Sequence, residues 1–115
     1  MIARTWRGAT RATDLERYTA YLFETGIAGY RVTPGNAGAL VLRRVVDDRA
    51  EFTVLSFWED EAAIGRFAGD DPGRAVFYPA DEAFLVDRDL RVVHWEVAPE
   101  APPGDRATAA EALSR

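Results

Sequence analysis

The sequence predicts an α+β domain of ferredoxin-like type, in which two helices cover a four-stranded antiparallel sheet. The 115 residues are about the length of one domain. The apolar residues switch between helical and strand spacing. The resulting segments follow the order strand, helix, strand, strand, helix, strand. Right-handed crossovers then give a sheet with strand order 4-1-3-2.

The first third of the chain predicts one strand and one amphipathic helix. Residues Ile2 to Arg7 form the expected strand. Thr13 and Glu16 have the spacing of a capping box, which predicts that a helix begins here. Gly26 and Gly29 are the expected stop signals of that helix. Its core-facing stripe consists of Leu15, Tyr18, Leu22 and Phe23.

The middle of the chain predicts a hairpin and a second helix. β-Branched and apolar residues indicate strands over Ala39 to Val46 and Phe52 to Trp58. Residues 47–50 are the expected turn between them. The acidic run Glu59 to Glu61 favours the start of a helix, and Gly69 is expected to close it.

The last part of the chain predicts a short helix, a strand and a tail. Asp71 followed by Pro72 has N-cap chemistry, which predicts a helix through Phe77. One further helical turn is expected around 83–85, and the last strand is expected over 90–97. The domain therefore covers residues 1–97. The Pro- and Ala-rich residues 98–115 are expected to form a flexible C-terminal tail.

The composition excludes several functional classes. The chain has no cysteine, which excludes thiol catalysis and zinc ribbons, and its single histidine is His94. It also lacks lysine, which excludes a Schiff base. Fourteen basic residues against nineteen acidic ones argue against a nucleic-acid partner. There is no apolar segment of membrane-spanning length and no signal-peptide pattern, so we expect a soluble, cytoplasmic protein without a membrane partner.

The strands are apolar on both faces, which predicts a homodimer. Phe57 is adjacent to Trp58, and Val92 is adjacent to Val93. Helices can cover only one face of the sheet. A second copy of the chain, packed sheet against sheet, would cover the other face.

A candidate site follows from the alternation of side chains along the strands. If the first, third and last strands share a register, one cavity is lined by Arg4, Trp6, Ser56, Trp58 and His94. That register stays open, because a shift of one residue moves every side chain to the other face. Tyr78, next to Pro79, is a further candidate at the mouth of the pocket.

These residue types suit a small aromatic ligand. His94 can take a proton near neutral pH and Arg4 can hold the resulting oxyanion, so both are candidate catalytic residues. Trp6, Ser56, Trp58 and Tyr78 are candidate substrate-binding residues. Structural alternatives stay open for each group. His94 would then be a buried, hydrogen-bonded strand residue, Arg4 would pair with Glu96 or Asp89, and the aromatic residues would fill the core.

The segment Leu55 to Phe67, LSFWEDEAAIGRF, resembles the strand-to-helix signature of the antibiotic biosynthesis monooxygenase-like family. The closing segment Val93 to Val97 is also similar to the last strand of members of this family. The resemblance implies a dimeric α/β barrel. It also implies one of several activities: oxygenation of polyphenolic polyketides without a cofactor, haem degradation, quinone modification, or no catalysis. Polyketide cyclases share the same barrel.

Within that family, the haem-degrading branch has a histidine on the second helix and an asparagine on the first strand. Residues 60–78 contain no histidine and residues 2–7 contain no asparagine, so haem degradation is not expected. We therefore expect a small enzyme without metal or organic cofactor, with monooxygenase-type or proton-transfer (cyclase) chemistry on an aromatic or polyketide-like molecule. The alternative is a non-catalytic dimer that binds a small ligand.

Overall fold

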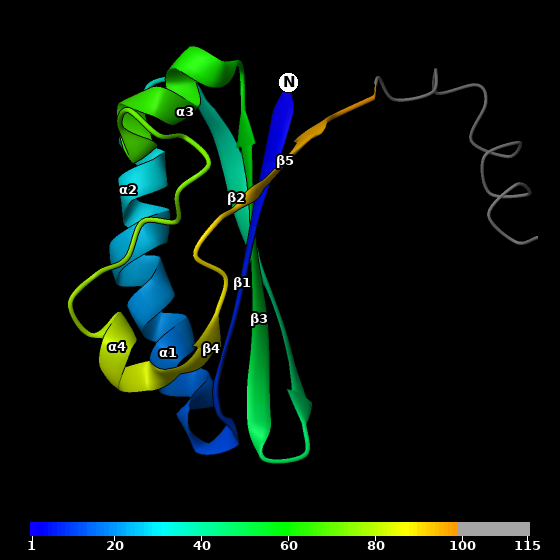
Figure 1. Ribbon diagram of the computed structural model, residues 1–115, viewed down its shortest axis with the longest axis vertical. Helices are drawn as coiled ribbons and strands as arrows, with labels where there is room; N and C mark the ends of the chain where they lie inside the picture. The colour runs from blue at the N-terminus through cyan, green and yellow to red at the C-terminus, as the bar shows by residue number, and fades with distance from the viewer. Residues whose placement is uncertain (99–115) are drawn as a thin grey trace, which may run out of the picture.

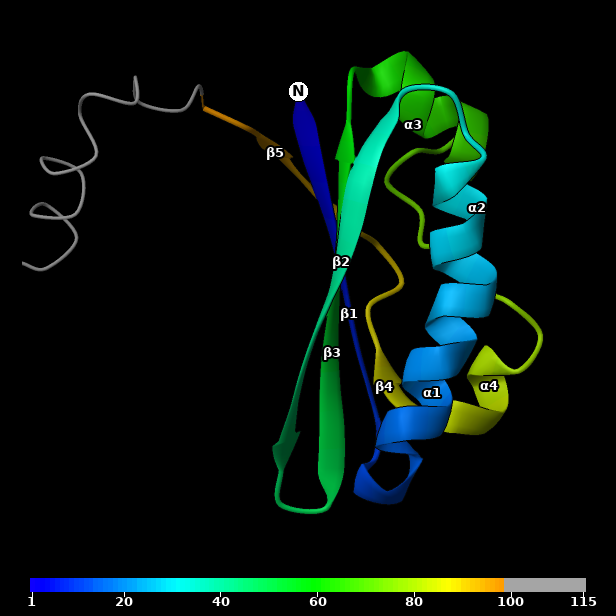
Figure 2. The same ribbon diagram turned by 180° about the vertical axis from the view of Figure 1, so that it is seen from behind.

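A computed structural model describes residues 1–98 and has an α+β fold, with all helices on one face of an antiparallel sheet (Figures 1 and 2). The strands are β1 (Ile2–Arg11), β2 (Asn36–Val46), β3 (Arg49–Trp58), β4 (Leu85–Arg88) and β5 (Val93–Glu96). The helices are α1 (Leu15–Leu22), α2 (Ala28–Arg31), α3 (Glu61–Ala68) and α4 (Asp81–Phe84), with a 3-10 turn η1 (Ala12–Asp14) and a π-helical turn η2 (Phe23–Ile27). Apart from Ala98, the expected tail lies outside the described residues.

The strand order confirms the predicted topology. The strands lie in the order β2-β3-β1-β4, and β5 also pairs with β1, so the sheet has five strands. The expected last strand over 90–97 is therefore only partly right, because two short strands share the β1 edge. The chain leaves the ladder between them, where the Asp89 N–H donates to the Arg7 carbonyl and the Asp89 carbonyl accepts from the Trp6 indole.

The hairpin of β2 and β3 has the expected position and is longer than predicted. Both strands continue to a two-residue turn at Asp47 and Asp48, in place of the expected four-residue connection. Asp47 has a φ of 55°, a left-handed conformation that aspartate tolerates in tight hairpin turns. Strand β1 also runs beyond Arg7 through Gly8, which pairs with Phe52 of β3.

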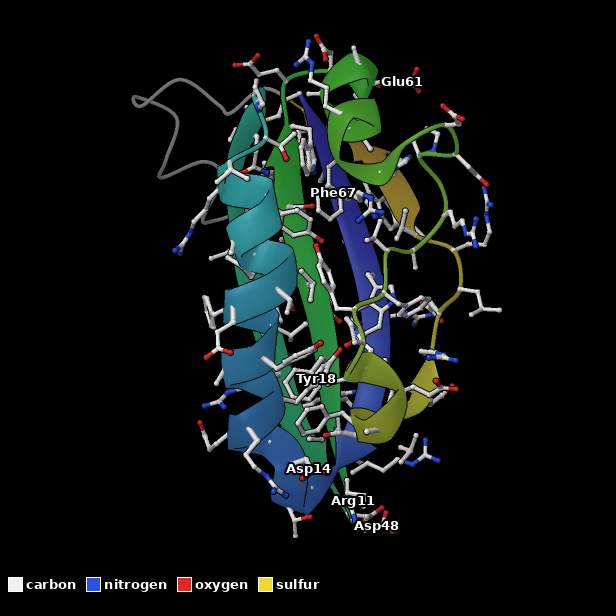
Figure 3. The ribbon with its side chains drawn as sticks, turned by 90° about the vertical axis from the view of Figure 1, so that its left-hand side faces the viewer. Arg11, Asp14, Tyr18, Asp48, Glu61 and Phe67 are labelled. Carbon is white, nitrogen blue, oxygen red and sulfur yellow. The ribbon has the colours of Figure 1, made fainter. Side chains whose placement is uncertain are left out.

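The predicted capping box is wrong. No side chain caps the start of α1, and a 3-10 turn precedes it. The buried Asp14 carboxylate instead pairs with Arg11 and Arg17. Figure 3 shows Asp14 and Arg11 near the bottom of the view. Burial raises the pKa of Asp14, but the hydrogen bonds from the two arginines outweigh it and hold the pKa below its ordinary value. Glu16 pairs with Arg43 of β2, so it does not turn back to the helix end.

The prediction that Gly26 and Gly29 end the first helix is wrong. The helix passes through both as η2 and α2 and ends at Arg31. The physical reason is close packing. A Cβ at Gly29 would lie 3.1 Å from Phe67 Cε1 and 3.1 Å from the Tyr78 hydroxyl, whereas one at Gly26 would meet only Tyr78, at an ordinary contact distance of 4.0 Å. Gly29 therefore admits the neighbouring aromatic rings, and the packing does not require a glycine at position 26.

The second helix begins and ends as predicted. The Asp60 side chain accepts from the Ala63 N–H, which makes it the N-cap of α3. Gly69 follows the helix with a φ of 82°. The helical turn expected around 83–85 is α4.

The predicted helix from Asp71 to Phe77 is wrong. Residues 69–80 form an irregular strap on the helix side of the sheet. The strap hydrogen-bonds to the segment before β5, from the Ala75 N–H to the Leu90 carbonyl and from the Val92 N–H to the Gly73 carbonyl. Asp71 forms a two-point ion pair with Arg91. These partners lie far away along the chain, which local capping rules do not detect.

The helices and the sheet enclose one aromatic-rich core. Tyr18 packs edge-on against Phe52 with ring centroids 5.0 Å apart, and Tyr30 packs against Trp58 at 5.6 Å. The opposite face of the sheet has no such cover in the described chain: Leu40, Leu42, Val93 and Trp95 are between 49% and 56% exposed. No helix in residues 1–98 is long and apolar enough to span a bilayer.

Candidate functional site

A small cavity lies between the helix layer and the sheet. It holds about 30 Å³ of free space, enough for about one water molecule. Its walls come from β1, the first helix, α3 and the strap over 69–80. The polar and aromatic lining residues are Arg4, Trp6, Tyr18, Thr25, Tyr30, Phe67, Phe77, Tyr78 and Asp81. Figure 3 shows Tyr18 and Phe67 pointing into the space between the helices and the sheet.

Arg4 is a buried cation in the cavity wall. Its side chain is 2% exposed, and its Cζ lies 5.7 Å from the centre of the Phe67 ring. One terminal nitrogen donates to the Arg74 carbonyl at 3.1 Å, whereas the buried Nε has no hydrogen-bond partner. The alternative that Arg4 pairs with Glu96 or Asp89 is wrong, because Asp89 pairs with Arg7 and no described carboxylate lies within ion-pair distance of Arg4.

Trp6 forms the floor of the cavity next to Arg4. Its indole N–H donates to the Asp89 carbonyl at 2.9 Å, and its ring meets Phe77 edge-on at 6.2 Å. The ring also lies over Gly8, where a Cβ would come within 2.4 Å of Trp6 Cη2. Gly8 therefore allows the indole to lie flat along its own strand.

Tyr30 and Tyr78 supply two phenol groups near Arg4. Burial raises the pKa of Tyr30, and the nearby Arg4 guanidinium opposes part of that rise. Burial also raises the pKa of Tyr78, with a further contribution from Asp81. Both hydroxyls are therefore neutral at physiological pH and can donate hydrogen bonds to a ligand.

The Tyr18–Asp81 pair fastens the strap to the first helix. The buried Tyr18 hydroxyl donates to Asp81 Oδ1 at 2.8 Å, and the Tyr78 N–H donates to Asp81 Oδ2 at 2.7 Å. Beside them, the Tyr21 hydroxyl accepts from the Ala80 N–H at 2.9 Å. Burial and the hydrogen bond to Asp81 raise the pKa of Tyr18 far above its ordinary value, so this hydroxyl keeps its proton.

His94 lies beside Arg4 across the β1–β5 pair. The two residues are Cα partners, so their side chains emerge on the same face of the sheet. His94 is exposed and is absent from the cavity wall, so the alternative of a buried structural histidine is wrong. Partial burial of the exposed ring and then the Arg4 charge lower the pKa of His94, and Glu61 offsets part of this shift. The imidazole is therefore neutral near pH 7.

Ser56 and Trp58 lie on the same face of the sheet but behind the cavity. Ser56 is the partner of Arg4 in the β1–β3 register, and Trp58 is the partner of Ile2. Both are fully buried, and the Trp58 indole N–H donates to the Ser56 hydroxyl at 2.9 Å. Neither contributes to the lining. Of the six candidates, Arg4, Trp6 and Tyr78 meet at the cavity, with His94 outside it on the same face.

Sequence reasoning missed the lining residues Tyr30, Phe67 and Asp81. The available signal for a polar partner of the first helix was a pair of tyrosines three residues apart, Tyr18 on the inward stripe and Tyr21 beside it. The partner itself is 63 residues away from Tyr18 in the chain, and no local pattern identifies it.

A larger groove, of about 380 Å³, lies on the uncovered face of the sheet. Four of its five arginines already have acidic partners, for example Arg7 with Asp89 and Arg44 with Glu51, and the fifth, Arg88, lies over the Phe77 ring. Within residues 1–98, the groove therefore has no buried charged group without a partner, whereas the smaller cavity has the Arg4 guanidinium. The cavity is for this reason the better candidate site.

The fold and the cavity define a class: a ferredoxin-like α+β domain with a small, aromatic-lined cavity between its helices and its sheet. Several solved structures share this fold. A Bacillus cereus protein provisionally named as an antibiotic biosynthesis monooxygenase is 16% identical, with a TM-score of 0.60 over 87% of this chain and 97% of its own. A Deinococcus radiodurans protein with the same provisional name is 14% identical, with a TM-score of 0.61 over 89% and 97%.

The haem degrader MhuD from Mycobacterium tuberculosis, solved with two haems in its active site, is 16% identical. Its TM-score is 0.50, over 89% of this chain and all of MhuD. No family model and no curated protein matches the sequence. The structural matches confirm the resemblance to the antibiotic biosynthesis monooxygenase-like proteins at the level of the fold.

The cavity does not fit a haem of the kind that MhuD holds. The lining contributed by residues 1–98 contains no histidine that could ligate iron, and His94, the single histidine of the chain, lies outside it.

Proposed function

We propose that this protein is a small cofactor-independent enzyme of monooxygenase type that acts on an aromatic, polyketide-like molecule in the cavity at Arg4. The observation that carries the proposal is the buried Arg4 guanidinium, whose Nε–H has no partner and which is surrounded by aromatic rings. A fixed cation in a dry aromatic site stabilises an oxyanion much better than the same cation in water. The shared fold with the monooxygenase-like structures supports the same class.

Arg4, Trp6 and Tyr78 are the proposed ligand contacts. Trp6 and Tyr78 offer flat surfaces for a ring, and Arg4 stabilises negative charge on a ring oxygen. Ser56 and Trp58 support the floor of the site from behind. A ligand larger than water requires the strap to move outwards, because residues 75–78 close the cavity. Two hydrogen bonds would resist that movement: the Tyr18 hydroxyl donates to Asp81, and the Tyr21 hydroxyl accepts from the Ala80 N–H.

His94 is the proposed general base at the rim of the site. A lowered pKa keeps the imidazole unprotonated, and exposure lets it pass an accepted proton to solvent. The proton would come from a phenol or from an activated C–H of the substrate. The resulting carbanion or phenolate, held at Arg4, can reduce dioxygen directly. A peroxide then forms at carbon and loses water to leave a carbonyl, so the substrate itself supplies the electrons.

The same groups would also serve a proton-transfer reaction such as cyclisation, which consumes no oxygen. Oxygen uptake with an anthrone-type polyphenol separates the two reactions. We expect stoichiometric oxygen consumption by the wild type and a loss of ~10²–10⁴ in rate for His94→Ala. Glu96→Gln, which changes an exposed residue on the same strand, is the matched control. Ring closure of a linear poly-β-ketone without oxygen uptake would favour the cyclase, and binding of the anthrone without turnover would favour the non-catalytic alternative.

We also propose that the protein is a homodimer that packs sheet against sheet. The uncovered face carries Leu40, Leu42, Val93 and Trp95, all about half exposed. Trp95 is held flat by a hydrogen bond from its indole N–H to the Thr5 hydroxyl at 3.0 Å. Large apolar side chains that are exposed and fixed in place are typical of an interface between subunits. A second copy would supply the same surface in return.

A further inference from the structure

Arg4 is the one buried arginine among residues 1–98. Of the eleven others, Arg31, Arg66, Arg74 and Arg88 are exposed to solvent, and seven form ion pairs with carboxylates: Arg7, Arg11, Arg17, Arg43, Arg44, Arg49 and Arg91. Each of these side chains is at least 37% exposed. Arg4 is 2% exposed and has no carboxylate within ion-pair distance among residues 1–98. The arginine that most needs a counter-charge therefore lacks one.

An arginine stays protonated at any physiological pH, so Arg4 cannot relieve its burial by losing a proton. The protein supplies the Arg74 carbonyl, the nearby Tyr30 hydroxyl and the face of Phe67, all of them uncharged groups that compensate only in part. A buried cation of this kind is normally paired. The remaining place for an anion is the cavity itself, which Arg4 lines.

The other charged residue of the lining, Asp81, does not provide that anion. It forms no ion pair with Arg4, and both of its carboxylate oxygens already accept hydrogen bonds, from the Tyr18 hydroxyl and the Tyr78 N–H. The rest of the lining is rich in aromatic rings, among them Trp6, Tyr30 and Phe77. This arrangement suits a flat ring whose negative charge lies at the Arg4 end, away from Asp81.

We propose that the cavity binds its ligand as an aromatic oxyanion, a carboxylate or a phenolate, with an anionic oxygen on the unpartnered Nε–H of Arg4. The proposal rests on the assignment of this cavity as the ligand site, and it names the charge state that the site selects. It concerns the bound ground state, and so it holds for a catalyst and for a binding protein alike.

Calorimetric titration with three probes tests the proposal: 2-naphthoate as the carboxylate, 4-nitrophenolate at alkaline pH as the phenolate, and 2-naphthamide as the neutral match of the first. We expect the wild type to bind at least one of the two anions tenfold or more tightly than the amide. Arg4→Met should abolish that preference and leave binding of the amide nearly unchanged. Arg4→Lys, which keeps the charge but loses the Nε donor, should give an intermediate preference and also covers the case in which Arg4→Met does not fold.

Arg7→Met is the matched control, because Arg7 is on the same strand, faces the other side of the sheet and is 74% exposed. It should bind all probes like the wild type. Equal affinity for anion and amide, an unchanged preference in the Arg4 variants, or no anion binding by the wild type at roughly 1 mM would each overturn the proposal. Anion binding without oxygen uptake or product formation would leave it standing while the enzymatic function fails. Turnover that is insensitive to Arg4→Met would support the enzymatic function and contradict the binding of the ligand as an anion at Arg4.

Discussion

Replacement of Tyr18 by phenylalanine should weaken the attachment of the strap and measurably destabilise the fold. The change removes one hydroxyl whose hydrogen bond to Asp81 is 2.8 Å long and fully buried. A hydrogen bond to a charged group contributes about 1.5–3 kcal/mol, and here its loss leaves a buried carboxylate oxygen unpaired. We therefore expect the free energy of unfolding to fall by about 2 kcal/mol, which corresponds to roughly 8–16 °C in Tm for a domain of this size.

Thermal or urea unfolding followed by circular dichroism measures this loss. Tyr21→Phe is the matched comparison, since it removes an acceptor from the Ala80 N–H in a half-buried and uncharged contact. That variant should lose only about 0.5–1 kcal/mol. If Tyr18→Phe were as stable as the wild type, or more stable than Tyr21→Phe, the buried Tyr18–Asp81 contact would not hold the strap as argued.

Three further predictions concern other parts of the molecule. NMR titration of His94, the single histidine, should give a pKa below 6.5, because partial burial of the ring and the Arg4 charge disfavour its protonation. Arg4→Met should raise that pKa. A wild-type pKa above 6.5 would contradict the account. Activity that depends on His94 should accordingly persist at pH 6.5 and fall only at lower pH. Light scattering should give twice the 12.7 kDa chain mass, and Trp95→Glu should give monomers; a monomeric wild type would refute the sheet-to-sheet dimer. Gly65→Ala should stabilise by about 0.5–1 kcal/mol, because nothing lies within 4 Å of the new Cβ, whereas Gly29→Ala should gain less or lose stability against Phe67 and Tyr78; equal gains would argue against the tight contact.

The fold was predictable because its signals are local or periodic. The inward stripe of Tyr18 and Leu22, the alternation along β3 and the acidic start of α3 all follow from residues within one or two turns of one another. The topology then follows from general rules on crossovers. The same local rules failed where a distant partner competed for the same group. Asp71 looked like a helix cap, but Arg91, twenty residues away in the chain, takes its carboxylate.

The site was predictable only in part. The strand alternation puts Arg4, Ser56 and His94 on one face only if the three strands share a register, which the sequence leaves open; the structure meets that condition by pairing Arg4 with both of the others. The alternation predicts the face of the sheet on which a side chain lies, but not how deeply that side chain is buried. The same face holds the buried Ser56, the cavity-lining Arg4 and the exposed His94, because the helices and the strap cover the sheet unevenly. The burial of Asp81 depends on the path of that strap, which the sequence analysis had assigned to a helix.

The most direct test of the account follows the Nε–H resonance of Arg4 by proton–nitrogen correlation NMR while an aromatic anion is added. The signal can be assigned by its disappearance in Arg4→Lys. Because this buried N–H has no partner in the free protein, we expect it to move strongly to lower field as 2-naphthoate is added, while the exposed Arg7 Nε–H stays in place. An Arg4 resonance that does not move while the ligand binds would contradict the assignment of Arg4 as the anchor of the site.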